Sequence, residues 1–163
     1  MVYFYCGLRL KQKFLMKTPI ILLVLTAAFF GYKLVSFSQD YYNEVLSIDL
    51  FKINISCISM LDESNLLIVV NLTNPSLKDI KVVSIIYDVY YETDPIGQQY
   101  IDLSSKPLIL NAQSTLGYES SVRNIGGVQL YEDMQIHIKV KVTIESSIFG
   151  LIHKESETDY IIS

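Results

Sequence analysis

The sequence predicts an all-β domain preceded by one apolar helix. Three observations lead to this fold class: an uncharged apolar run near the N-terminus, a series of segments rich in Val, Ile and Tyr after it, and turn residues between those segments. No amphipathic helix of useful length is expected after Leu46. With 163 residues, the chain has room for one domain and an appendage.

The charge is unevenly distributed along the chain. The first 33 residues contain five basic residues and no acidic one, whereas residues 34–163 contain 8 basic and 17 acidic residues. An acidic body argues against nucleic-acid binding, because phosphate contacts need clustered Lys and Arg. The basic N-terminal segment instead suits an anionic membrane surface.

Residues 18–37 form the predicted transmembrane helix. Thr18–Tyr32 is an uncharged run of 15 residues, and counting through Phe37 gives 20 positions. That is roughly 30 Å of helix, enough for the hydrocarbon core, and Lys33 can extend its ammonium group to the interface. Because the basic residues precede the span, the positive-inside rule predicts a cytoplasmic segment 1–17 and an extracytoplasmic β domain.

Two alternatives remain open for the N-terminal region. A cleaved signal peptide would use Ile20–Phe30 as its apolar core, but the available small-residue pair, Thr26 with Ala28, is a poor cleavage site. Translation starting at Met16 would instead leave Lys17 alone to set the topology. We expect an uncleaved signal anchor.

The β domain is expected over residues 47–163, after a juxtamembrane linker at 38–46 that could also continue the helix. In the first strand Ile53, Ile55 and Cys57 alternate with polar residues, which predicts one buried face that includes Cys57. Residues 61–65 have the composition of a turn.

The central strand pair of the domain is expected at residues 66–72 and 80–91, on either side of Asn74-Pro75-Ser76. In the second run the period-two spacing places one apolar set on the buried face: Val83, Ile85, Tyr87, Val89 and Tyr91. The other face holds Val82, Ile86 and Tyr90, interrupted by Ser84 and Asp88.

Further strands are expected at residues 98–103, 108–110, 114–122, 135–145 and 152–162. A type I turn at Asp94–Gly97 would return the first of these along the 80–91 strand. Residues 124–133 read as a loop, and the Lys- and Glu-rich last strand reads as a charged edge. About seven strands in roughly 115 residues predict an antiparallel β-sandwich of immunoglobulin or fibronectin-III type, with a small barrel as the alternative.

The region 66–122 resembles the core of the late embryogenesis abundant (LEA) type 2 family, which overlaps the water-stress and hypersensitive-response domain. The residues that carry the resemblance are Val69–Pro75, Ile80–Tyr91, Pro95-Ile96-Gly97, Leu108–Ala112 and Leu116–Val122. They match the family in detail over about a third of the chain and in pattern over the β body. The resemblance implies a fibronectin-III-like sandwich, often behind an N-terminal membrane helix, without enzymatic activity or catalytic residues to carry over.

The sequence offers no catalytic, cofactor-binding or metal-binding constellation. His137 and His153 have no second His or Cys at ligand spacing and are interpreted as surface histidines. Asp88 is interpreted as solvent-facing rather than as a buried carboxylate. Asn54-Ile55-Ser56 and Asn71-Leu72-Thr73 match the glycosylation pattern within predicted strands. Cys6 and Cys57 would lie on opposite sides of the membrane and so could not pair.

These observations predict a non-enzymatic, single-pass membrane protein of a cellular envelope or a virion. Its β-sandwich would bind a partner protein, scaffold an assembly or form a homo-oligomer, and it would need no cofactor and no nucleic acid. A second hypothesis is a lipid or apolar-ligand site between the sheets, lined by Tyr87, Val89, Tyr91 and the 135–145 strand, although an ordinary core is favoured. A third is LEA-type stress protection, which does not follow from a fold alone.

Overall fold

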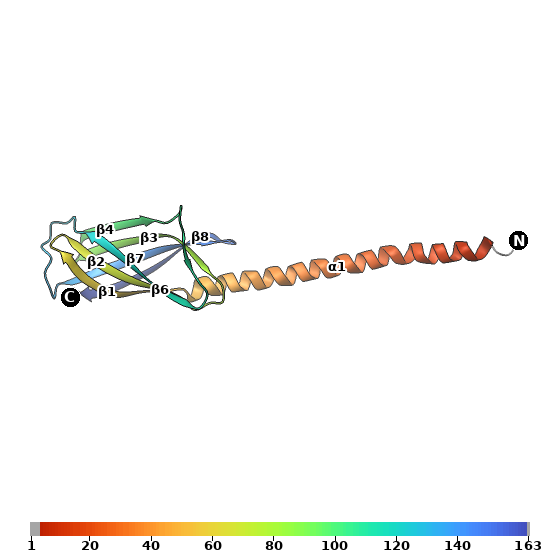
Figure 1. The fold of residues 1–163 in the computed structure, drawn as a ribbon, viewed down its shortest axis with the longest axis horizontal. Helices are drawn as coiled ribbons and strands as arrows, with labels where there is room; N and C mark the ends of the chain where they lie inside the picture. Colours follow the sequence, from red (N-terminus) through yellow and green to blue (C-terminus); the bar gives the residue numbers. More distant parts are fainter. Residues whose placement is uncertain (1–3, 163) are drawn as a thin grey trace. The chain divides into compact units, whose positions relative to one another are not determined.

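A computed structural model describes the chain from Phe4 to Ile162, with side chains from Ile21 onward. The side chains of the expected cytoplasmic segment 1–17, Cys6 among them, therefore lie outside the described part. The chain divides into two compact units, one ending at Tyr42 and one beginning at Asn43. Figure 1 shows a long helix in the first unit and a two-layered β domain in the second.

Helix α1 runs from Phe4 to Leu50. From Ile21 it is long and apolar enough to cross a membrane, a property that a signal sequence would share. The segment 38–46, expected to be a linker or a continuation of the helix, is helical, so it continues α1. The strand expected from Ser47 begins instead at Lys52, because the helix continues for another turn until the buried Phe51 enters the core.

Eight strands follow the helix in the described part of the chain, close to the expected number of about seven, and each overlaps a range in which a strand was expected. They are β1 (Lys52–Asp62), β2 (Asn65–Asn74), β3 (Ile80–Tyr91), β4 (Asp94–Asp102), β5 (Leu108–Leu110), β6 (Ser114–Arg123), β7 (Gln135–Ser146) and β8 (Gly150–Ile161). All pairings are antiparallel. One sheet has the order β1-β2-β6, and the other has the order β4-β3-β7-β8 with β5 added beside β3.

The hydrophobic core lies between the two sheets. Its buried members come from both of them, including Ile68 and Val70 of β2 and Ile138 and Val140 of β7. The alternation of β7 is the clearest in the chain: Ile136, Ile138, Val140, Val142 and Ile144 are all buried, as the sequence predicts. Burial of such aliphatic side chains is the main favourable contribution to folding, about 1.5–3 kcal/mol each.

Two β-bulges change which residues face the core. The register of β3 shifts between Val82 and Ser84, so Val82 turns inward with 0% exposure, contrary to the expectation from strict alternation. The register of β1 shifts between Ile55 and Cys57, which leaves Cys57 exposed and buries Ile58 in its place. An extra residue in one strand reverses the facing of every residue that follows it. The expected burial of Cys57 is therefore wrong.

The β3–β4 hairpin forms, but its turn lies three residues earlier than expected. Glu92 and Thr93 make the turn, and Asp94–Gly97 already belongs to β4. Glu92 adopts a left-handed backbone conformation with φ of 55°. This replaces the predicted type I turn and places a carboxylate at the tip of the hairpin.

Candidate functional site

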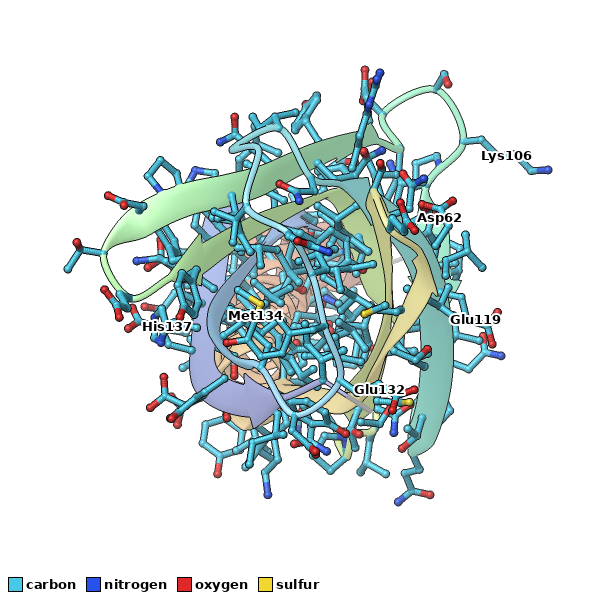
Figure 2. All side chains as sticks on the ribbon, turned by 90° about the vertical axis from the view of Figure 1, so that its left-hand side faces the viewer. Asp62, Lys106, Glu119, Glu132, Met134 and His137 are labelled. Atoms are coloured by element: carbon cyan, nitrogen blue, oxygen red, sulfur yellow. The ribbon has the colours of Figure 1, made fainter. Side chains whose placement is uncertain are left out.

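One end of the β domain is built from four segments that are far apart in the sequence. We call it the far end: the β1–β2 turn at 62–65, the β3–β4 turn at 92–93, the loop 124–134 and the end of β8. Backbone hydrogen bonds join these segments, since Asn124 N donates to Ser64 O at 2.8 Å and Ile125 N donates to Ile96 O at 2.7 Å. Figure 2 views the domain from this end, where Glu132, Met134 and His137 lie.

The loop 124–134 has a defined conformation although it contains no strand. Asp133 N donates to Ile162 O at 3.0 Å, and Ile162 N donates to Met134 O, also at 3.0 Å. Leu130 and Met134 are buried in the core. These contacts fix the segment that carries Tyr131, whose side chain is 53% exposed.

A pocket of about 350 Å³ opens at the far end. It is lined by Tyr91, Glu92, Tyr131, Gln135, Ile136, His137 and Asp159. The apolar part comes from the two tyrosines and the buried Ile136, and the acidic part from Glu92 and Asp159. We refer to it as the far-end pocket. Sequence reasoning missed it, because its lining residues become neighbours only through the sheet pairing.

Hydrogen bonds order the polar side chains of the far-end pocket. His137 Nδ1 lies 3.0 Å from Asp159 Oδ1, and His137 Nε2 lies 3.8 Å from Glu157 Oε2. A hydrogen bond with Tyr131 raises the pKa of the Tyr91 hydroxyl, and the negative charges that Tyr131 and Glu92 can carry add to this effect. His137 is thus a half-exposed residue on the outer face of its sheet and is hydrogen-bonded to a carboxylate. This largely agrees with the expectation of a surface histidine.

A shallow groove lies on the outer face of the five-stranded sheet and has a volume of about 660 Å³. Its centre holds a hydrogen-bonded row in which Ser84 Oγ donates to Thr143 Oγ1 at 2.8 Å, and Thr143 Oγ1 lies 3.1 Å from His153 Nδ1. In this row the imidazole contacts Thr143 rather than Ser84, and both hydroxyl residues are buried. Its chemistry fits cross-strand bonding within the sheet.

The remaining residues singled out from the sequence are dispersed over the domain. Asp88 is half-buried on the outer face and accepts a hydrogen bond from Gln98 Nε2 at 2.7 Å. Asn54 and Asn71 lie opposite each other in the β1–β2 register, the first exposed and the second half-buried. Among the side chains from Ile21 to Ile162, no group of three His, Cys, Asp or Glu residues has the arrangement of a metal site.

The opposite, or near, end contains a buried carboxylate that the sequence pattern does not reveal. Glu44, which is 5% exposed, pairs with Lys78 Nζ from the β2–β3 loop and accepts a hydrogen bond from Ser147 N at 3.0 Å. Burial by itself would raise the pKa of Glu44, but hydrogen bonds from Lys78, Ser146 and Ser147 outweigh it, so the pKa lies below its ordinary value. These contacts attach the last turns of α1, from Asn43, to two loops of the sandwich.

Structure comparison finds similar solved structures at low sequence identity. A candidate LEA protein, At2g46140.1, known from its solution structure, is 12% identical with a TM-score of 0.52, and the match covers 84% of this chain and 85% of that one. AT1g01470 from Arabidopsis thaliana is 17% identical with a TM-score of 0.45, covering 68% and 78%. A protein from Archaeoglobus fulgidus is 14% identical with a TM-score of 0.45, covering 69% and 96%.

No protein-family model and no curated protein matches the chain. The match to At2g46140.1 supports an LEA-like fold for the β domain, in agreement with the resemblance seen in the sequence. At this level of identity the likeness concerns the fold alone. The β domain thus has an LEA-like fold and follows an apolar helix.

Proposed function

We propose that this protein is a non-enzymatic, single-pass membrane protein of a cellular envelope or a virion, and that its β domain is a module for binding a partner protein. The observation that carries the proposal is the apolar face of α1. From Ile21 to Phe37 its large apolar side chains are more than half exposed, Leu23 to 71%. An exposed apolar surface of this size is unfavourable in water, and a bilayer surrounds a helix with an apolar environment on all sides.

The strand order supports a fibronectin-III-like sandwich for the module. The first two strands share a sheet with β6, while β3 pairs with β4 on one side and with β7 on the other, and β8 pairs with β7. The charged β8 and the bulged β1 protect two of the edges against unwanted pairing. Domains of this architecture commonly use their end loops and outer faces for recognition.

The packing of the core supports partner binding over the apolar-ligand hypothesis. Tyr87 and Val89, which would line a cleft between the sheets, are fully buried within one continuous core cluster. Native mass spectrometry of the full chain, extracted gently from its membrane, tests this point. A co-purifying protein or a defined homo-oligomer supports the module, and a stoichiometric lipid held by the domain would favour the ligand hypothesis instead.

The two native cysteines test the proposed anchor and its orientation. Cys57 is exposed on the β domain, and Cys6 precedes the apolar run. A membrane-impermeant maleimide added to intact cells should label the Cys6→Ser variant at Cys57. It should label the Cys57→Ser variant at Cys6 only after permeabilisation. The reverse pattern would contradict the orientation, and a mature chain that begins after the apolar run would show that the helix is a cleaved signal.

A further inference from the structure

We propose that the far-end pocket binds an arginine or lysine side chain of a partner protein. The inference deepens the proposed function, because it names the chemistry that the module recognises. It starts from the combination of two tyrosines, an apolar floor and two carboxylates in one cavity of about 350 Å³. A long cationic side chain has the complementary parts, an apolar stem and a charged head.

The aromatic walls provide the first part of this recognition. Tyr91 is half-buried against the core, and Tyr131 is exposed to solvent on the loop 124–134. Both side chains line the pocket, and the backbone hydrogen bonds of Asp133 and Met134 with Ile162 fix the loop that carries Tyr131. Cations bind to the faces of such rings, and guanidinium groups also stack on them. Because the backbone that carries the two tyrosines is already held in place, binding does not have to order the loop.

The distribution of charge supplies the second part. The three segments that meet here, 91–94, 131–137 and 157–162, contain six carboxylates and no Lys or Arg. These carboxylates are Glu92, Asp94, Glu132, Asp133, Glu157 and Asp159. Asp159 is bonded to the half-exposed His137, while Glu92 belongs to the pocket wall. Glu157 is paired with Lys139 Nζ at 3.2 Å, so a cationic group that enters the pocket meets a predominantly negative field from the other five carboxylates.

The extent of the acidic surface favours a protein over a small cation as the occupant. Asp94, Glu132 and Asp133 belong to the same end without lining the pocket, so one small ligand would leave them without a counterpart. A basic polypeptide segment can place one side chain in the pocket and its neighbours beside the outer carboxylates. Complementary charge of this kind mainly speeds association and fixes the orientation of the partner.

The test is an NMR titration of the full chain in maltoside micelles, which carry no cationic headgroup. The probe is a short Gly-Ser peptide with one central arginine, and the matched probe carries citrulline, its neutral isostere. We expect the arginine peptide to shift the amide signals of Tyr131, Gln135 and His137, and the citrulline peptide to leave them in place. Tyr131→Ala and Glu92→Gln should each weaken binding by about two- to fivefold, since both groups are solvent-accessible.

Two control variants remove an exposed large side chain and an exposed carboxylate outside the pocket. Ile125→Ala removes an exposed apolar side chain from the same loop, and Glu63→Gln removes an exposed carboxylate from the β1–β2 turn. Both should bind the arginine peptide like the wild type. Equal shifts with citrulline, or unchanged binding by Tyr131→Ala, would overturn the proposal. Stronger binding of choline than of the arginine peptide would overturn it too, in favour of a small quaternary ammonium ligand.

The outcome is separable from that of the proposed function. If the cysteines show a cleaved or inverted N-terminus while the arginine peptide still binds, the pocket assignment stands and the membrane role fails. If the anchor is confirmed and the peptide does not bind, the pocket assignment alone fails.

Discussion

Replacing Tyr87 with phenylalanine should stabilise the β domain. Tyr87 lies on β3 in the middle of the core with 0% exposure, and its hydroxyl has no hydrogen-bond partner within the described part of the chain. Burial raises the pKa of this hydroxyl well above its ordinary value, and the nearby Tyr118 adds to the shift. The Tyr87 hydroxyl is therefore shielded from water and has no hydrogen bond that replaces its lost hydration.

The expected gain follows from two opposing contributions. A buried hydroxyl without a partner costs about 1–3 kcal/mol relative to the hydrated group. Removing one oxygen atom leaves a small void, which costs a few tenths of a kcal/mol. The ring itself keeps its packing, because phenylalanine has the same shape without the hydroxyl. The Tyr87→Phe variant should therefore unfold with a free energy about 1–2 kcal/mol higher than that of the wild type.

Denaturant unfolding of the full chain in maltoside micelles measures this difference. Tyr100→Phe is the matched control, because it removes a hydroxyl from a side chain that is 60% exposed, and its free energy of unfolding should change by less than about 0.5 kcal/mol. A Tyr87→Phe variant less stable than the wild type would refute the reasoning. It would show that the hydroxyl has a partner in solution, and so would revive the hypothesis of a ligand between the sheets.

Three further outcomes are expected from the near end and the surface. Glu44→Gln should lower the free energy of unfolding at pH 7. Because the folded pKa of Glu44 is depressed, this difference from the wild type should disappear as the pH falls through the ordinary carboxyl range and below it, which unfolding curves from pH 7 to pH 3 would show. Asn74→Ala should lower the free energy of unfolding by about 3 kcal/mol in the same assay. The reason is that the Asn74 amide is fully buried, donates to the carbonyls of Lys78, Leu110 and Asn111, and accepts from Ser76. Asn71→Ala, at a more exposed position, is the control. In the folded chain Cys57 should react with a water-soluble maleimide at a rate close to that of the denatured chain, and strong protection would contradict the bulge in β1.

The strands were predictable because the pattern of apolar and polar residues within each segment indicates a strand without reference to its partners. Alternation with period two identifies β7 and its five inward-facing aliphatic residues, and the charged pattern of β8 identifies an edge strand. Which residues of β1 and β3 face the core was predictable on only one side of the bulge in each strand. A bulge depends on how the partner strand aligns, as for Val82 against Ile144 of β7, and no local pattern encodes that alignment.

The far-end pocket and the Glu44 cluster were not predictable from the sequence for a related reason. Tyr91, Tyr131 and Asp159 are separated by tens of residues, and each alone reads as an ordinary surface residue of a strand end or loop. Glu44 reads as a solvated residue of a polar segment, and becomes buried only where Lys78 and Ser147 meet it. Such sites are made by tertiary contacts between polar residues, to which hydrophobic periodicity is insensitive.

The two ends of the β domain differ in how their polar groups are used, and this difference indicates which end can recognise a partner. At the near end the carboxylate of Glu44 and the amide of Asn74 are buried and saturated by groups of the same chain. Breaking those bonds for a partner would leave buried groups unpaired at a cost of about 1–3 kcal/mol each. At the far end Tyr131 and Asp159 are exposed on segments that the backbone already holds in place. A partner can contact them without disturbing the core, so recognition should take place at the far end.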